Sequence, residues 1–467
     1  MRAPVLALVL ALAAPALAAD QLRLPPITRA TFDNGLRVLV VEYHELPLVE
    51  FHLIVGAGAA QDPPGKEGLA ALTAGTLTRG TGKLSADELA RAIDSLGGRI
   101  GATPGTDGTI VTAEFLAPDF ATGLDLLRQV LLDPAFARDE VRRRRDEQAA
   151  GIVAELEETS AIADKCFAGF LYGAHPYGRP VDGLSTTVPK LGRGDVTDFY
   201  ERWYRPNDTI LVLVGDVAAA EATIRLREAF GAWRPRTNAI AARAAPPARL
   251  TARRVLLVDK PDATQTQIRL GNVAIARNDP AYVPAIVANT ILGGGFTSQL
   301  IEELRIKRSL TYSAWSAFVA RLTGGDFRLG TFTKTPTTTE TLALALSVEG
   351  GFRSHPPARE RLAKAKTYLR GQFPLRIESP DALAARLGEA EFNALGPEEL
   401  ATYRERVAAV TPEQAAETAA KLMPPPETVA IVVVGKAADI HDALAARFGP
   451  IETMAARDCE KLSTAKR

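Results

Sequence analysis

Short apolar runs alternate with longer amphipathic stretches along the whole chain. Residues 38–42, 210–215, 255–259 and 430–435 have the length and the β-branched content of buried strands. Residues 85–96, 124–132, 139–158, 281–292 and 357–369 place apolar side chains at helical spacing and are predicted helices. This mixture predicts an α+β fold in which helices cover one face of each sheet.

The predicted strands occur twice. Val38 and Val255 lie in similar runs 217 positions apart, and two strands that end at Gly215 and Gly435 are 220 apart. The helix before each glycine-ended strand also opens alike, with Thr197 and Thr411 as candidate N-caps. Such a period predicts two homologous α/β halves of about 210 residues. We assign residues 19–233 and 251–450 to the halves, 234–250 to a linker and 451–467 to a tail.

The N-terminus has the features of a secretory signal. Arg2 precedes an apolar run, and Ala16 and Ala18 form a small-x-small cleavage site. The run is too short to span a bilayer comfortably, so we expect cleavage after residue 18, export to the periplasm and no membrane span afterwards. Among the 467 residues, 55 Lys and Arg balance 55 Asp and Glu, which disfavours a nucleic-acid partner.

The cysteines and histidines give no metal-binding pattern. Export would place Cys166 and Cys459 in an oxidising compartment, but the sequence leaves open whether they pair or stay as two free structural cysteines. The five histidines are nowhere three or four positions apart, so we expect isolated structural roles, with His175 in a turn. The five are His44, His52, His175, His355 and His441.

Three groups of motifs together resemble the pitrilysin/insulinase-type zinc peptidases, the inverted zincins that include processing-peptidase-like chains. They lie at residues 62–81, at 171–180 with 199–216, and at 292–300 with 304–312. Their order and spacing match the family from about residue 27 to about 450. The resemblance implies two halves that enclose a chamber like a clamshell. It also implies peptide substrates bound in extended form against a sheet edge.

The zinc-binding motif of that family is missing here. Catalytic members carry His-x-x-Glu-His on a helix, which holds zinc and activates water. The corresponding residues are Ala71, Ala74 and Gly75, and none of them binds metal or accepts a proton. A third ligand is expected near residues 151–153, where there is no carboxylate. Glu155, Glu157 and Glu158 lie just beyond that window and are not assigned. We therefore expect no metal in this chain.

Another part of the family's site is retained. Arg305 and Tyr312 have the family's spacing, and the resemblance implies that they bind substrate and the oxyanion of the transition state. We expect a helix over residues 297–308 and the start of a strand over 309–313. Residues 49–55 with Gly56, Ala57 and Gly58 are expected at the sheet edge that pairs with peptide.

These features predict a non-catalytic subunit of a heterodimeric zinc metallopeptidase. Its partner would carry His-x-x-Glu-His and the zinc, while this chain supplies Arg305 and Tyr312 in trans. One alternative is a peptide-binding or structural scaffold protein with no part in catalysis. Another is an active peptidase with a relocated metal site, which the histidine spacing disfavours. The basic run at residues 142–145 lies among acidic residues and is expected to form a solvated, salt-bridged helix face.

Overall fold

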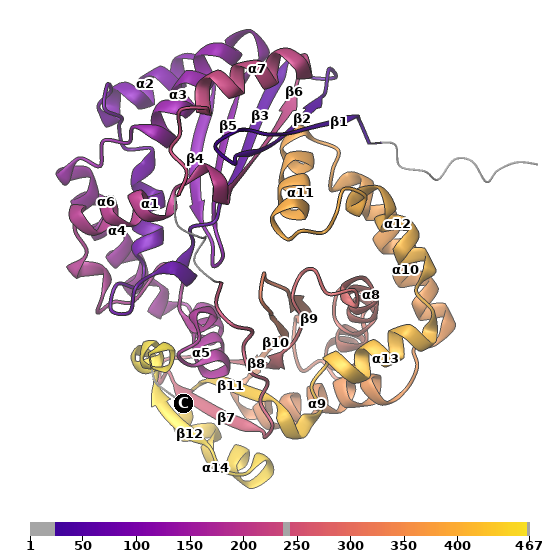
Figure 1. The fold of residues 1–467 in the computed structure, drawn as a ribbon. Coiled ribbons are helices and arrows are strands. Elements are labelled where there is room, and N and C mark those ends of the chain that lie inside the picture. The colour runs from indigo at the N-terminus through magenta and orange to yellow at the C-terminus, as the bar shows by residue number, and fades with distance from the viewer. Residues whose placement is uncertain (1–23, 237–242, 465–467) are drawn as a thin grey trace, which may run out of the picture.

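The structure is a computed structural model that describes residues 24–236 and 243–464. The predicted signal peptide, residues 1–18, and residues 237–242 of the predicted linker lie outside the described residues. Figure 1 shows two sheets, each with its own set of helices, that face each other as the halves of a clamshell. The predicted fold class is therefore confirmed. Within the described part of the chain, no helix has the length and hydropathy needed to cross a bilayer.

The two sheets have six strands each, and five strands follow the same order in both, while the outer strands β1 and β12 pair in opposite directions. The first sheet has the order β1-β2-β6-β3-β5-β4 and the second has β12-β7-β11-β8-β10-β9. The strands of the first are β1 (Ile27–Thr31), β2 (Arg37–Glu42), β3 (Leu48–Val55), β4 (Arg99–Pro104), β5 (Thr109–Leu116) and β6 (Thr209–Gly215). Those of the second are β7 (Arg254–Asp259), β8 (Gln265–Val273), β9 (Ala314–Val319), β10 (Asp326–Lys334), β11 (Ala430–Gly435) and β12 (Glu452–Ala455).

The repeat seen in the sequence is a repeat of strand register. β2 and β6 are parallel and end with Glu42 opposite Gly215, while β7 and β11 are parallel and end with Asp259 opposite Gly435. The acidic residue has the same task in both halves. Its carboxylate accepts a hydrogen bond from the first backbone N–H of the next helix, at 2.7 Å from Ala219 and 3.0 Å from Ala437. Carboxylates at helix N-termini are stabilising. Each carboxylate therefore fixes its own strand to the helix that follows the neighbouring glycine-ended strand.

Most helices pack in the core of their own half, some on the sheet and others on neighbouring helices. In the first half these are α1 (Leu69–Leu77), α2 (Ala86–Ser95), α3 (Phe120–Leu132), α4 (Arg138–Ala154), α6 (Arg193–Trp203) and α7 (Ala219–Phe230). In the second they are α8 (Tyr282–Leu292), α9 (Thr338–Ser354), α10 (Arg359–Leu375), α12 (Glu399–Ala409), α13 (Pro412–Leu422) and α14 (Ala437–Phe448).

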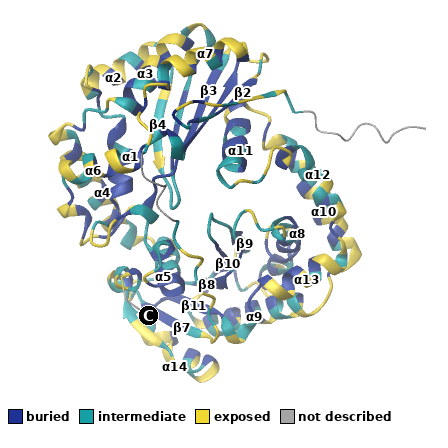
Figure 2. Ribbon diagram, viewed as in Figure 1, coloured by how far each residue is buried: buried dark blue, intermediate teal, exposed yellow. Residues whose placement is uncertain are grey.

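Two helices are exchanged between the halves. α5 (Thr159–Tyr172) comes from the first half but packs on β8 and β11 of the second sheet. α11 (Pro380–Phe392) comes from the second half and packs on β3 and β6 of the first sheet, as Figure 1 shows. The helices start 221 positions apart, close to the spacing of the repeated strands. The exchange corrects the expectation that each sheet is covered on one face. Figure 2 accordingly shows the central strands buried.

The predicted tail is part of the second half. Within residues 451–467, β12 extends the second sheet by pairing with β7, and the 3₁₀ segment η10 (Ala456–Ser463) packs on α5. A disulfide joins Cys459 of η10 to Cys166 of α5, with 5.1 Å between the Cα atoms. The structure thus answers the question that the sequence left open. The bridge ties the end of the chain to a helix supplied by the first half.

One of the two predicted N-caps is wrong. Thr411 caps α13, with its hydroxyl accepting from the backbone N–H of Gln414 at 3.1 Å. Thr197 instead lies inside α6, where its hydroxyl donates to the carbonyls of Arg193 and Gly194. α6 starts earlier because Asp195 accepts from the backbone N–H of Gly192 and provides the cap.

Two ionisable residues of β3 are buried between the first sheet and α11. Glu50 is 2% exposed and His52 is 6% exposed. Burial, together with the nearby carboxylate of Glu114, raises the pKa of Glu50 to about 8, although the Arg99 guanidinium 4.0 Å away opposes the shift. Burial likewise lowers the pKa of His52 to about 4. Both side chains are therefore mostly neutral near pH 7.

We expect loss of the disulfide to destabilise the protein by about 2–5 kcal/mol, since the bridge restricts a very long segment of the unfolded chain. The measurement is urea unfolding of Cys459→Ser against wild type, with and without reductant. Reductant should destabilise wild type by a similar amount and leave Cys459→Ser unchanged. Equal stability of the variant and oxidised wild type would contradict the prediction.

Glu50→Gln should stabilise the fold increasingly as pH rises. The unfolded carboxyl loses its proton near its ordinary value of 4.5, whereas the folded one keeps it until about 8. Wild-type stability therefore falls between these pH values, and the substitution removes that loss. We expect the difference between the two proteins to grow by about 4 kcal/mol from pH 4.5 to pH 8. Glu221→Gln, which changes an exposed α7 carboxylate paired with Arg225, is the control and should show a flat difference.

Candidate functional site

The helix that carries the degenerate zinc motif is held firmly at its start. Gly68, the N-cap of α1, has φ 95°, a left-handed conformation that favours glycine. The carboxylate of Asp62 accepts hydrogen bonds from the backbone N–H groups of Gly68 and Ala70, at 2.7 and 2.8 Å. The amide of Gln148 on α4 donates to the Gly68 carbonyl at 3.0 Å. These bonds fix α1 against α4, which is the helix expected to carry the third ligand.

The residues at the family's zinc position do not fit a zinc ion. Ala71 and Ala74 are 2% and 0% exposed and pack in the core. The space beside Gly75 holds the Arg144 side chain, a cation. In the third-ligand window, Ile152 is buried among apolar residues. Within residues 24–236 and 243–464, no group of three His, Cys, Asp or Glu side chains is placed to hold a metal ion.

The acidic residues just beyond that window have other partners. Glu155 forms an ion pair with Lys165, and Glu157 lies 3.5 Å from the Lys260 ammonium. Glu158 is the N-cap residue of α5. These positions serve the junction between α4 and α5.

The structure brings Arg305 and Tyr312 together. The guanidinium carbon of Arg305 lies 4.5 Å from the centre of the Tyr312 ring, a cation–π contact. The Tyr312 side chain is highly exposed, at 73%. In the described part of the chain, Arg305 has no carboxylate partner. Both polar groups are therefore free to contact another molecule.

The local structure around this pair differs from the expectation. Residues 297–308 are helical over 299–306, and most of this segment is a π-helix, η7 (Ile301–Ile306), in which the N–H of Lys307 reaches the carbonyl of Glu302. The strand starts at Ala314 and not at residue 309. Ser309 has φ 52°, and the Thr311 hydroxyl bonds to the backbone of Ser313 in a local turn. This turn is what leaves Tyr312 in solvent.

The expected peptide-binding edge is wrong in one respect. β3 lies between β6 and β5, so residues 49–55 are not at the edge, and the edge strand on that side is β4. The loop after β3 is closed by the β4–β5 hairpin, because a Cβ on Gly58 would touch Thr106 O and Gly108 N at 2.5 Å. Gly56 lies similarly against the Asp208 carboxylate, and Ala57 is fully buried. A substrate contact at Gly56, Ala57 and Gly58 stays a prediction.

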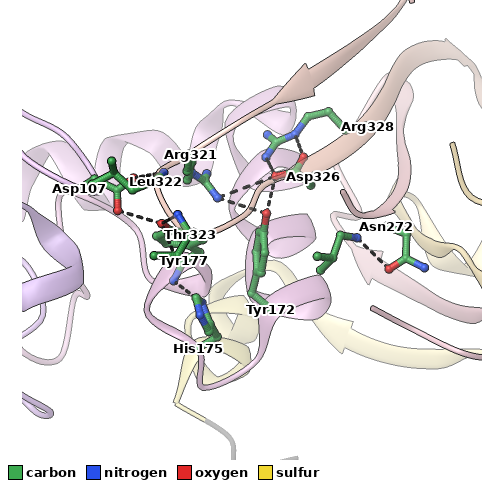
Figure 3. Close-up of polar contacts among 11 residues, drawn as sticks. Asp107, Tyr172, His175, Tyr177, Asn272, Arg321, Leu322, Thr323, Asp326 and Arg328 are labelled. Carbon is green, nitrogen blue, oxygen red and sulfur yellow. Dashed lines mark hydrogen bonds and ion pairs between the residues drawn. The ribbon is translucent and has the colours of Figure 1, made fainter. Parts of the chain in front are cut away.

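A polar joint between the halves was not foreseen. Figure 3 shows the β4–β5 hairpin and the β9–β10 hairpin meeting at Tyr177. Its hydroxyl donates to the Asp107 carboxylate at 2.9 Å and accepts from the Thr323 N–H at 3.1 Å. Beside it, the buried Asp326 carboxylate pairs with Arg328 and accepts a 2.7 Å bond from Tyr172. Burial raises the pKa of Tyr177 to about 12.

The predicted structural role of His175 in a turn is confirmed. His175 caps the short segment η4 (Pro176–Gly178), its Nδ1 accepting from the Tyr177 N–H at 3.1 Å. Burial lowers its pKa, which suits a neutral ring. The motif at residues 171–180 contained the signal for the joint, since both of its tyrosines take part. No pattern in the sequence indicated Asp107 or Asp326.

Comparisons with known proteins agree with the resemblance. Residues 37–180 match the family described as insulinase (peptidase family M16), and residues 190–369 match the peptidase M16 inactive domain. An uncharacterized zinc protease of Mycobacterium leprae is 28% identical, over 79% of this chain and 82% of its own. A non-peptidase homolog of Helicobacter pylori is 24% identical, over 73% and 78%.

Solved structures give the same result. The crystal structure of a peptidase M16 inactive domain from Pseudomonas fluorescens superposes with a TM-score of 0.83 and 27% identity, covering 88% of this chain and 98% of that one. A protease from Helicobacter pylori has the same fold, with a TM-score of 0.80, 20% identity and coverage of 88% and 100%. The chain belongs to the insulinase (M16) peptidase family, as a non-catalytic member in which the zinc-binding positions are substituted.

Proposed function

We propose that this chain is the non-catalytic subunit of a heterodimeric periplasmic zinc metallopeptidase, and that Arg305 and Tyr312 act on substrates at a zinc site in the partner. The observation that carries the proposal is the exposed cation–π pair. An aromatic ring that is 73% exposed, under a guanidinium with no carboxylate partner among residues 24–236 and 243–464, contributes little to the stability of this fold.

The chemistry of the pair suits a peptide bond under attack. A phenol donates a hydrogen bond to the oxyanion of a tetrahedral intermediate, and a guanidinium holds a carbonyl or carboxylate in fixed geometry. The zinc and the general base would come from the His-x-x-Glu-His of the partner chain. This division leaves each chain inactive alone, since one lacks the metal and the other lacks the supporting donors.

Two features support export. The N-terminal residues have the pattern of a cleaved signal, and the disulfide between Cys166 and Cys459 needs an oxidising compartment to form. The periplasm meets both conditions.

The second candidate function is a peptide-binding or structural scaffold protein with no part in catalysis. The similarity to a protein described as a non-peptidase homolog favours it. The two candidates differ in whether substitutions of the exposed pair affect peptide hydrolysis by an assembled complex.

Tyr312→Phe and Arg305→Ala should each lower kcat/KM of the reconstituted complex by about 100-fold, which is typical for loss of one oxyanion donor. The measurement uses a quenched fluorescent peptide with this chain, a zinc-bearing family partner and their mixture. Tyr368→Phe and Arg308→Ala change exposed side chains outside the pair and are the controls, which should leave the rate unchanged. Binding of the partner by each variant is checked separately. Unchanged rates for both Tyr312→Phe and Arg305→Ala in the assembled complex would exclude the shared site.

Elemental analysis of the purified chain should find no stoichiometric zinc after dialysis, because Ala71, Ala74 and Gly75 offer no ligand atoms. The assembled complex should contain zinc in proportion to the partner and lose activity on chelation. Tightly held zinc in this chain alone, with chelator-sensitive peptide hydrolysis, would show that the metal site has moved elsewhere.

A further inference from the structure

The position that the second zinc-binding imidazole would take is filled by an arginine. A Cβ built on Gly75 would lie 2.4 Å from Nε of Arg144 and about as close as contact allows to Cδ and Cγ, at 3.2 and 3.3 Å. A side chain at residue 75 and the observed Arg144 conformation therefore exclude each other. Arg144 comes from α4, so a basic residue expected on a solvated face instead points at the degenerate motif.

The surroundings of Arg144 carry an excess of positive charge. Arg79, which follows α1, and Arg143 and Arg144 of α4 are here called the arginine cluster. Among the described residues, the carboxylates within ion-pair distance of the cluster are Glu140 and Glu147. Three guanidiniums against two carboxylates leave one positive charge unbalanced.

Within the part of the chain that the structure describes, the guanidinium donors of the arginine cluster are also left without hydrogen bonds to the two carboxylates beside them. Its nitrogen-to-oxygen distances to Glu140 and Glu147 are 3.5–3.9 Å, longer than charge-assisted hydrogen bonds. In the described residues, no hydrogen bond joins the three guanidiniums to these carboxylates. One oxygen of Glu140 is buried without any hydrogen-bond partner. The donors of the cluster are thus available to an incoming anion.

The cluster lies where an extended peptide has a place to bind. α1 packs beside β4, which is an edge strand of the first sheet and, within the described residues, pairs with β5 on one side alone. Edge strands offer backbone groups to an added strand, so a peptide paired with β4 would run next to α1. The Arg144 side chain is 34% exposed and can be reached from solvent.

We propose that the arginine cluster is a carboxylate-binding site that receives the C-terminal carboxylate or an Asp or Glu side chain of an extended peptide. A guanidinium matches the two oxygens of a carboxylate with two parallel N–H donors. The same positive charge repels a divalent cation. The position that binds zinc in catalytic relatives is therefore suited here to binding an anion. The inference rests on the peptide-handling part of the proposed function but does not need the partner chain.

The test is fluorescence anisotropy of the full chain with three labelled hexa-alanine probes. One probe has a free C-terminal carboxylate, one is the C-terminal amide, and one is the amide with an internal Glu. Wild type should bind at least one carboxylate probe about tenfold or more tightly than the plain amide. The probe that shows the preference identifies whether the terminal or the side-chain carboxylate is bound.

Arg144→Ala should remove that preference and leave binding of the amide probe unchanged. Arg142→Ala is the matched control, because its side chain is 65% exposed on the same helix and pairs with Asp139. Gly75→Ala adds only a Cβ that displaces Arg144, and it should weaken carboxylate binding with the total charge unchanged. Thermal unfolding confirms that each variant is folded.

Three results would overturn the inference. They are an intact preference in both Arg144→Ala and Gly75→Ala, an equal loss in Arg142→Ala, and no carboxylate preference of wild type up to about 1 mM protein. The assay uses this chain alone, whereas the shared site is tested in the mixture. Failure of the Tyr312 and Arg305 predictions would therefore leave the carboxylate result standing, and the reverse also holds.

Discussion

The structure depends on a reciprocal exchange, in which each half places one helix, α5 or α11, on the sheet of the other half. The central strands β6 and β11 are buried along their whole length, so each sheet has two apolar faces to cover. The helices of one half cover a single face. α5 and α11 cover the other faces across the boundary, and burial of side chains such as Phe167 and Leu387 contributes about 2 kcal/mol each. Either half alone would expose an apolar sheet face to water.

The polar joint sets how far the halves can move. Hydrophobic packing is not directional, so the exchanged helices alone would permit sliding. The Tyr177 hydroxyl fixes the relative position of the halves, because it forms directional hydrogen bonds with a hairpin from each half. The Asp107 carboxylate of the β4–β5 hairpin also accepts from the backbone N–H of Leu322 in the β9–β10 hairpin at 3.2 Å, which joins the two halves directly. Opening of the clamshell at this end has to break these contacts, so motion is easier at the opposite side.

Local signals in the sequence predicted the parts of the fold that depend on local interactions. The repeat of glycine-ended strands, the helix over residues 85–96 and the N-cap at Thr411 all depend on interactions within a few residues or within one strand pair. The exchange of α5 and α11 was missed because an apolar helix face does not specify which sheet it covers. β12 was missed because its four residues contain no apolar run.

The candidate site also has parts that the sequence predicted and parts that it did not. The resemblance implied a shared role for Arg305 and Tyr312, and the structure places them in contact, whereas the left-handed φ of Ser309 in the preceding turn leaves no mark in the pattern of polar and apolar residues. Arg144 was assigned to a solvated face because acidic neighbours surround the basic run. The missing side chain at residue 75 was the available signal, since a glycine among buried alanines leaves space that a neighbouring helix can fill.

The two parts of the family's site have opposite physical states in this chain. Around α1 the space that zinc ligands would need is occupied by two buried alanines and the Arg144 guanidinium. Imidazoles at residues 71 and 75 would require the surrounding core to expand and Arg144 to move away. Tyr312, in contrast, is exposed to solvent, and within the described residues the Arg305 guanidinium has no carboxylate partner. The stability of the fold does not require either feature. A surface of that kind, apolar at one end and polar at the other, is typical of groups that contact another molecule. This contrast favours a chain whose remaining site is completed from outside.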